Sequence, residues 1–286
     1  MRFACLRAFQ ALILTGVLAA APPASAQQRP LVTEDPETIG AGRILLEGGM
    51  DLAHDYHNTV SGLQGNLVTI PTIGLSFGLS SIAELQIDGG LFNHLTITSR
   101  DPTAPLAPLL RIDGDSTHDI SNAVVATKIR IVPEGASRPS IGLRFATKLP
   151  NASNEKGIDL DTTDFAASLL LAKTIQSVRV VGNIGAAILT KPTGEPGQND
   201  VVLYSLSFAR AVTQQAEVVG EVNGRISTRD PSPPGTETHG ILKLGGRYTR
   251  GPARFDAAVF FGTTTIDPTV GVTIGFTYVF SAFTIP

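Results

Sequence analysis

Charged residues at a two-residue spacing are the part of this chain that could do chemistry. Seventeen of them fall where an extended backbone would turn their side chains to one common face. Eight are acids and nine are bases, so this face carries almost no net charge. Such groups either pair with one another or present a polar surface to a solute. The set comprises Glu47, Asp51, Asp55, Glu84, Asp88, Lys128, Arg130, Arg144, Lys148, Arg179, Glu217, Glu221, Arg225, Lys243, Arg247, Arg254 and Asp256.

We predict that these side chains line the lumen of a barrel and form its constriction, with acidic and basic sectors that alternate around the wall. The bases between 128 and 148 would face a second basic group between 243 and 254 across the lumen. Two interpretations stay open. The charges pair across strands and plug the interior, or they border a narrow polar passage with a transverse field.

Histidines are the other residues with possible chemistry. His94, His118 and His239 fall on the inward face near the outer ends of their strands, whereas His54 faces outward and His57 lies in a loop. Inward histidines could bind a metal or orient a nucleophile, or they could be polar residues where strands meet water. No His-Glu-x-x-His motif and no phosphate-cradling glycine loop is present. We therefore predict no catalytic residue, metal or cofactor, and no enzyme activity.

The elements that position these residues are strands with strict alternation. Between Val270 and Phe280, for example, apolar side chains alternate with glycine and threonine. This period of two predicts half-buried β-strands. It recurs in twelve ranges: 43–56, 65–77, 82–97, 118–132, 140–149, 164–175, 178–189, 201–212, 215–226, 240–250, 253–262 and 269–280.

Strand length and connection length together predict an all-β fold, a closed antiparallel up-and-down transmembrane barrel of about twelve strands. Most of the predicted strands have ten to fourteen residues, close to the ~9–11 of a tilted membrane-crossing strand. Short turns alternate with long polar loops, which is typical of outer-membrane barrels. Pro71 interrupts the second strand and predicts a bulge or break there.

The N-terminus predicts export. Arg2 and Arg7 precede an apolar stretch over 8–21, and Ala24-Ser25-Ala26 fits a cleavage site, so residues 1–26 read as a signal peptide. Residues 27–42 would form an N-terminal periplasmic segment, and 43–286 the barrel. The single cysteine, Cys5, lies within the signal peptide, which excludes a disulfide framework. A net charge of −3 argues against nucleic acid as a partner.

Two stretches resemble a known family. Arg29-Pro-Leu-Val-Thr-Glu-Asp-Pro-Glu-Thr-Ile-Gly-Ala-Gly42 is similar to the opening of the outer-membrane proteins of the meta-pathway of phenol degradation family, which are transporter-like. Phe77-Gly-Leu-Ser-Ser-Ile-Ala-Glu-Leu-Gln-Ile-Asp88 resembles their early hairpin. The resemblance implies a barrel in the cell outer membrane that takes up hydrophobic or aromatic compounds.

Three functional hypotheses follow. The leading one is a narrow channel or uptake protein for small solutes, with outer-membrane lipid and the barrel-assembly machinery as its other partners. The second is a barrel enzyme that acts on lipid, which would need a serine, a histidine and a polar orienter at the lipid-facing rim. The third is a structural barrel with a salt-bridged, closed interior.

Overall fold

A computed structural model describes residues 29–192 and 198–283, so the predicted signal peptide over 1–26 lies outside the described residues. No helix in these ranges is long and apolar enough to cross a membrane. The described residues form two short 3-10 helices, η1 (Ala107–Leu109) and η2 (Asn154–Lys156), and fourteen strands. The strands are β1 (Arg43–Asn58), β2 (Leu63–Gly78), β3 (Ala83–Gly90), β4 (Asn93–Arg100), β5 (Ser116–Asp119), β6 (Val124–Val132), β7 (Ser140–Lys148), β8 (Asp164–Ile175), β9 (Val178–Thr190), β10 (Gln198–Ala211), β11 (Ala216–Ser227), β12 (His239–Arg250), β13 (Ala253–Gly262) and β14 (Val270–Ser281).

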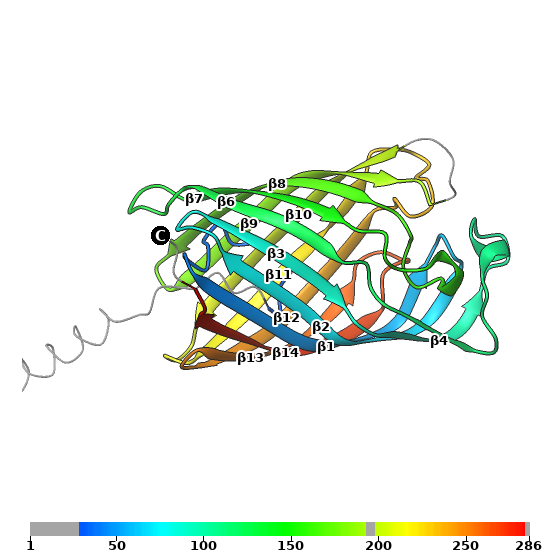
Figure 1. The fold of residues 1–286 in the computed structure, drawn as a ribbon, viewed down its shortest axis with the longest axis horizontal. Coiled ribbons are helices and arrows are strands. Elements are labelled where there is room, and N and C mark those ends of the chain that lie inside the picture. Colours follow the sequence, from blue (N-terminus) through cyan, green and yellow to red (C-terminus); the bar gives the residue numbers. More distant parts are fainter. Residues whose placement is uncertain (1–28, 193–197, 284–286) are drawn as a thin grey trace, which may run out of the picture.

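The strands close into a ring (Figure 1). β3 with β4, and β6 with β5, each fill one position of this ring, so the fourteen strands occupy twelve positions. Consecutive strands pair antiparallel from β6 to β14, and β1 pairs with both β14 and β2. The second half of β2, residues 72–78, pairs with β3, and its first half, residues 63–69, pairs with β4. β3 and β4 therefore follow each other along the same neighbouring strand. Likewise β6 pairs with β3 and β5 with β4. This arrangement confirms the predicted closed antiparallel barrel. We call the end with the short turns, near residue 283, the turn end, and the opposite end the loop end.

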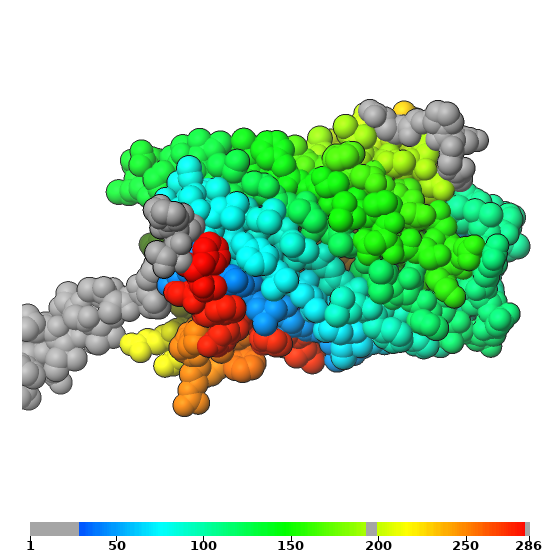
Figure 2. Space-filling view, in the orientation of Figure 1, coloured from blue at the N-terminus to red at the C-terminus, as the bar shows by residue number. Residues whose placement is uncertain are grey.

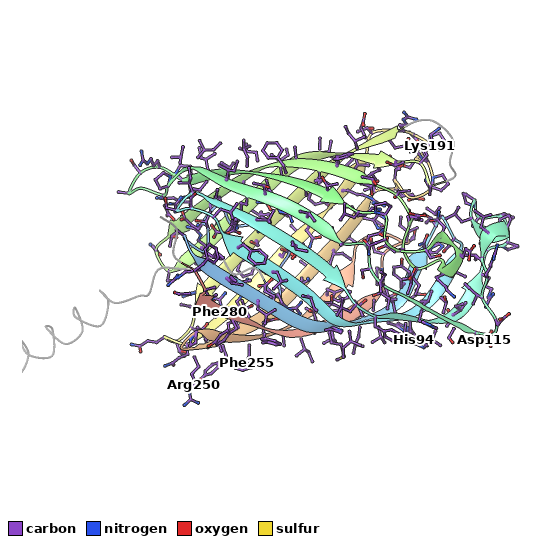
Figure 3. The ribbon with its side chains drawn as sticks, in the orientation of Figure 1. His94, Asp115, Lys191, Arg250, Phe255 and Phe280 are labelled. Carbon is purple, nitrogen blue, oxygen red and sulfur yellow. The ribbon has the colours of Figure 1, made fainter. Side chains whose placement is uncertain are left out.

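Alternation puts large apolar side chains on the outer wall. On β9 and β14, Ile184 and Ile274 are 57 % and 49 % exposed, whereas Thr273 next to Ile274 is 3 % exposed. Phe255 and Phe280 also lie on the wall, toward the turn end (Figure 3). A closed sheet with an apolar outer face satisfies its backbone groups internally, as a bilayer requires.

The strand pair β3–β4 and the strand β2 each contain a break, and the side chains beyond the break point to the opposite face. Gly90 of β3 pairs with Thr72 and Asn93 of β4 with Thr69, and the inner face passes from the even-numbered residues of β3 to the odd-numbered residues of β4, so the alternation is reversed across the break. Asn93 and Leu95 are therefore buried, and His94 lies on the opposite face beside the exposed Phe92. The prediction of an inward side chain was wrong for His94, and equally for His118, its partner on β5. β2 has its own irregularity at Ile70–Pro71, as the proline predicted.

Loops fill the space beneath the extension of β4 and β5. Figure 1 shows β4 reaching beyond the main wall, and in Figure 2 the teal and green residues that follow it form the loop end. Ile158, from the connection between β7 and β8, packs there with Leu63, Leu95 and Ile97. Asn58 Nδ2 donates to the carbonyl of Ile158 at 3.1 Å. The long connection thus folds back into the barrel mouth and is held by its own apolar cluster.

The register of the wall makes a direct prediction. Arginine at Ile184 or Ile274 should destabilise the folded barrel by about 2–4 kcal/mol, because the charge would lie in hydrocarbon. Arginine at Leu189, on the same strand as Ile184, should cost much less, because this side chain lines a cavity at the loop end. Urea unfolding of the reconstituted barrel measures both costs. Equal costs at Ile184 and Leu189 would contradict the register.

Candidate functional site

The N-terminal residues cross the interior of the barrel. The sequence assigns 27–42 to a periplasmic segment ahead of the barrel, but residues 29–39 contact strands on opposite sides of the ring. Glu34 reaches Lys128 on β6, and the carbonyl of Arg29 accepts a hydrogen bond from Arg247 Nε on β12 at 2.7 Å. We call Arg29–Ile39 the crossing segment. Its acids and free backbone groups find partners in a lumen that the wall lines with bases.

Glu34 is the centre of the buried part of this contact. Its carboxylate lies 3.3 Å from Lys128 Nζ and 3.0 Å from Arg144 Nε. Lys128 is also 2.9 Å from Glu84, and its side chain is 0 % exposed. Arg144 extends to Asp88 at 3.6 Å. Two bases and three carboxylates therefore form one network, in which each buried charge has an opposite charge beside it.

Asp35 and Glu37 continue the contact toward the turn end. Asp35 accepts two hydrogen bonds from Arg179, at 2.8 Å and 2.6 Å, in the bidentate geometry that arginine favours. Arg179 also pairs with Glu134, in the turn after β6. Burial raises the pKa of that carboxyl, but hydrogen bonds from the Thr174 amide and Arg179 outweigh it and hold the pKa below the usual value. Glu37 pairs with Arg130.

Backbone groups anchor the other half of the crossing segment. The amide and hydroxyl of Thr33 both donate to Glu221 Oε2 at 2.6 Å. Lys243 Nζ donates to the carbonyl of Pro30 at 2.8 Å. These contacts replace the strand-to-strand hydrogen bonds that an irregular segment lacks, so the buried polar backbone is satisfied.

Arg29 fixes the end of the crossing segment against β14 and the first two strands. Its guanidinium donates to the hydroxyls of Thr72 and Thr273, both at 2.9 Å. A Cβ added at Gly49 or Gly275 would come within 2.3 Å of a guanidinium nitrogen, so a larger residue at either place would displace the Arg29 side chain. These glycines let the side chain lie flat on the inner wall.

Most of the predicted lumen residues meet at the crossing segment. Those in contact with it are Glu47, Asp51, Glu84, Lys128, Arg130, Arg144, Arg179, Glu221, Lys243, Arg247 and Asp256.

The other predicted lumen residues have different partners. Glu217 lies 3.9 Å from both Arg247 and Arg254, and Lys148 pairs with Asp164 at 2.7 Å. The bases between 128 and 148 and those between 243 and 254 do not face each other directly, because the crossing segment lies between them.

Sequence reasoning missed Glu34, Asp35 and Glu37. Three acids in four residues, just before a barrel whose inner face carries nine bases, were the available signal.

Water reaches part of the crossing segment. Val32, within the crossing segment, is 55 % exposed. A cavity of about 330 Å³ lies at the loop end, and we call it the loop-end cavity. Residues from β1, β7, β8, β9, β11 and β12 line it, together with the loops that follow them. Arg225 and His239 are among the lining residues. Lys191 is not a lining residue, but it lies at the same end of the molecule (Figure 3).

His239 is the one of the three predicted inward histidines that lines the loop-end cavity. Its Nδ1 lies 2.6 Å from Asp267 Oδ1. Burial raises the pKa of the Asp267 carboxyl, but hydrogen bonds from Thr264, the Gly240 amide and His239 outweigh burial and lower the pKa below the usual value. Asp267 therefore stays ionised and holds the ring of His239 in place.

Comparison with known proteins gives structural matches only. No protein family and no curated protein matches the chain in sequence. The COG4313 outer membrane channel from Pseudomonas putida F1 aligns over 86 % of this chain and 98 % of its own, with a TM-score of 0.64 and 10 % identity. The chain has the fold of an outer-membrane β-barrel.

Two further solved barrels are similar to a lesser degree. The KdgM porin, solved with disordered oligogalacturonate, has a TM-score of 0.49 at 9 % identity, over 83 % of this chain and 99 % of its own. The translocator domain of the autotransporter NalP from Neisseria meningitidis has a TM-score of 0.47 at 12 % identity, over 97 % of each chain. At such identities the likeness concerns the fold.

Proposed function

We propose that this protein is a narrow uptake channel of the outer membrane for small solutes, hydrophobic or aromatic compounds among them. The proposal rests on a closed barrel with an apolar outer face, a charged lumen and a cavity at its loop end. The similar fold of a known outer membrane channel supports it. The resemblance of residues 29–42 and 77–88 to the meta-pathway of phenol degradation family supports membership in that family.

The remaining parts of the proposal follow from this function. The signal peptide over 1–26 would direct export, and the barrel-assembly machinery would insert the chain into outer-membrane lipid. The turn end would then face the periplasm and the loop end the exterior. A solute would enter the loop-end cavity and reach the crossing segment, which ion pairs and hydrogen bonds hold without a covalent link. Displacement of this segment would expose the charged wall as a polar constriction.

An enzyme acting on lipid has less support. His239 and Asp267 form the pair that a catalytic triad would require, but they lie at the loop-end cavity, away from the lipid-facing rim. Within residues 29–192 and 198–283, no serine hydroxyl hydrogen-bonds to His239. A closed structural barrel remains the second candidate, because the crossing segment occupies the lumen.

Solute flux into liposomes distinguishes the channel from the closed barrel. We expect reconstituted protein to let small uncharged solutes enter, with rates that fall steeply as solute size rises, because the crossing segment narrows the lumen. Heat-dependent gel mobility would show that the barrel is folded. Liposomes that hold folded barrel and admit none of the solutes would favour the closed barrel.

A further inference from the structure

The loop-end cavity contains a guanidinium with unused hydrogen-bond donors. Arg225 on β11 stands directly opposite His239 on β12, and both residues line the cavity. Arg225 Nε donates to the carbonyl of Glu237 at 3.0 Å. Within the described ranges, its two terminal nitrogens donate to no other group, and no carboxylate forms an ion pair with it. Arg225 is partly buried, so these donors have lost part of their hydration.

The two acids that line the cavity, Asp159 and Asp164, are already satisfied. Asp159 accepts from the amides of Leu160 and Asn122, at 2.8 Å and 3.0 Å. Asp164 accepts from the Thr190 amide at 2.9 Å and pairs with Lys148 at 2.7 Å. These carboxylates therefore have little need of a cationic ligand. Glu237, whose carbonyl binds Arg225, has a buried Oε2 without a hydrogen-bond partner, but it is not among the residues that line the cavity. Among the lining residues, the unmet requirement is for an acceptor.

Asp267 is satisfied in the same way, and its contact fixes the ring of His239 at the cavity. Its two oxygens contact His239 Nδ1 at 2.6 Å and the Gly240 amide at 3.0 Å. Nδ1 of His239 is thereby occupied, and its Nε2 has no partner within residues 29–192 and 198–283. Arg225 and His239 thus present neighbouring nitrogen atoms to the same space.

Apolar groups form another part of the lining. Leu160, Leu189, Pro192 and Pro234 border the cavity, and none of them can hydrogen-bond to a ligand through its side chain. A ligand that suits both parts has one anionic head and one apolar body. A volume of about 330 Å³ admits a molecule of the size of a substituted six-membered ring.

We propose that the loop-end cavity binds a small organic monocarboxylate. The carboxylate accepts two hydrogen bonds from the terminal nitrogens of Arg225, in the fork geometry that arginine forms with carboxylates. His239, held by Asp267, lies beside the head group, and the leucines and prolines contact the apolar body. The inference deepens the proposed channel by naming a substrate class for its entrance, but binding itself requires no conduction.

Isothermal titration of the full folded chain in detergent tests the proposal with three probes of one shape: benzoate, benzyl alcohol and benzylamine. We expect benzoate to bind about tenfold or more tightly than either of the others, because only the carboxylate completes the charge-assisted pair. Arg225→Met should weaken benzoate binding by about tenfold or more. The matched control is Arg111→Met, which removes an exposed arginine paired with Glu155 and should leave the affinity unchanged.

The outcomes separate this proposal from the proposed function. Benzyl alcohol binding as tightly as benzoate, no benzoate binding to the wild type, or equal losses from the two arginine variants would each overturn the site. The probe comparison on the wild type holds even where a variant fails to fold. Solute flux without benzoate binding would leave the channel standing without this site, and benzoate binding without flux would leave the site standing without the channel.

Discussion

Replacing the acids of the crossing segment by amides, as Glu34→Gln, Asp35→Asn and Glu37→Gln together, should raise the single-channel conductance several-fold. The three carboxylates hold this segment against bases on β6, β7 and β9. Without them the segment loses its strongest contacts, and the bases are left to line the lumen. Anion selectivity should rise for the same reason. Planar-bilayer recording at symmetric and asymmetric salt measures both quantities.

The control removes the same number of negative charges elsewhere. Asp101→Asn, Asp113→Asn and Glu155→Gln change acids of the loop end that do not contact the crossing segment, so the conductance should stay at the wild-type value. Unchanged conductance in the first variant, with a barrel that is folded by heat-dependent gel mobility, would show that ion pairing does not hold the segment across the lumen.

The largest loss of stability is expected from Lys128→Met. Lys128 is fully buried and lies between Glu34 and Glu84, so the substitution leaves two carboxylates without their shared cation. Breaking a buried ion pair on one side typically costs about 3–5 kcal/mol, because the remaining charge stays desolvated. Unfolding in urea, followed by circular dichroism, should show a loss of that order.

Lys148→Met on the next strand is the matched control. Lys148 forms one ion pair, with Asp164, and its side chain is 21 % exposed. Water can solvate the carboxylate that remains, so we expect a loss of about 1 kcal/mol or less. Equal losses at the two lysines would mean that the environment of Lys128 is as well hydrated as that of Lys148.

The strands of the barrel could be predicted from the sequence because their alternation is local. The range 43–56 was predicted for a strand that runs from Arg43 to Asn58, and 178–189 for one from Val178 to Thr190. Each outward side chain must be apolar because it contacts hydrocarbon, so a membrane-crossing strand shows an apolar residue at every second position. The outward direction of Ile274 and the inward direction of Thr273 follow from the same constraint.

Two features could not be predicted, for separate physical reasons. The break after Gly90 reverses the alternation within an otherwise regular pattern, so His94 faces opposite to the predicted direction. The crossing segment has no period at all, because side chains of distant strands satisfy its backbone. Glu34 and Lys128 are 94 positions apart, so their contact depends on closure of the whole ring.

We expect water and solutes to reach the crossing segment from the loop end. Val32, at 55 % exposure, is the residue of this segment to test. With Cys5 lying in the predicted signal peptide, a Val32→Cys variant would carry one cysteine in the mature chain. The measurement is the single-channel current while a charged, membrane-impermeant thiol reagent is added on the loop side alone. Val218→Cys, which faces lipid, serves as the control.

We predict that the reagent modifies Val32→Cys and lowers the current in discrete steps, because each adduct adds bulk where the lumen is narrowest, while Val218→Cys keeps its current. A folded Val32→Cys barrel that never reacts from the loop side, and whose current does not change, would contradict a passage that leads from the loop end to the crossing segment.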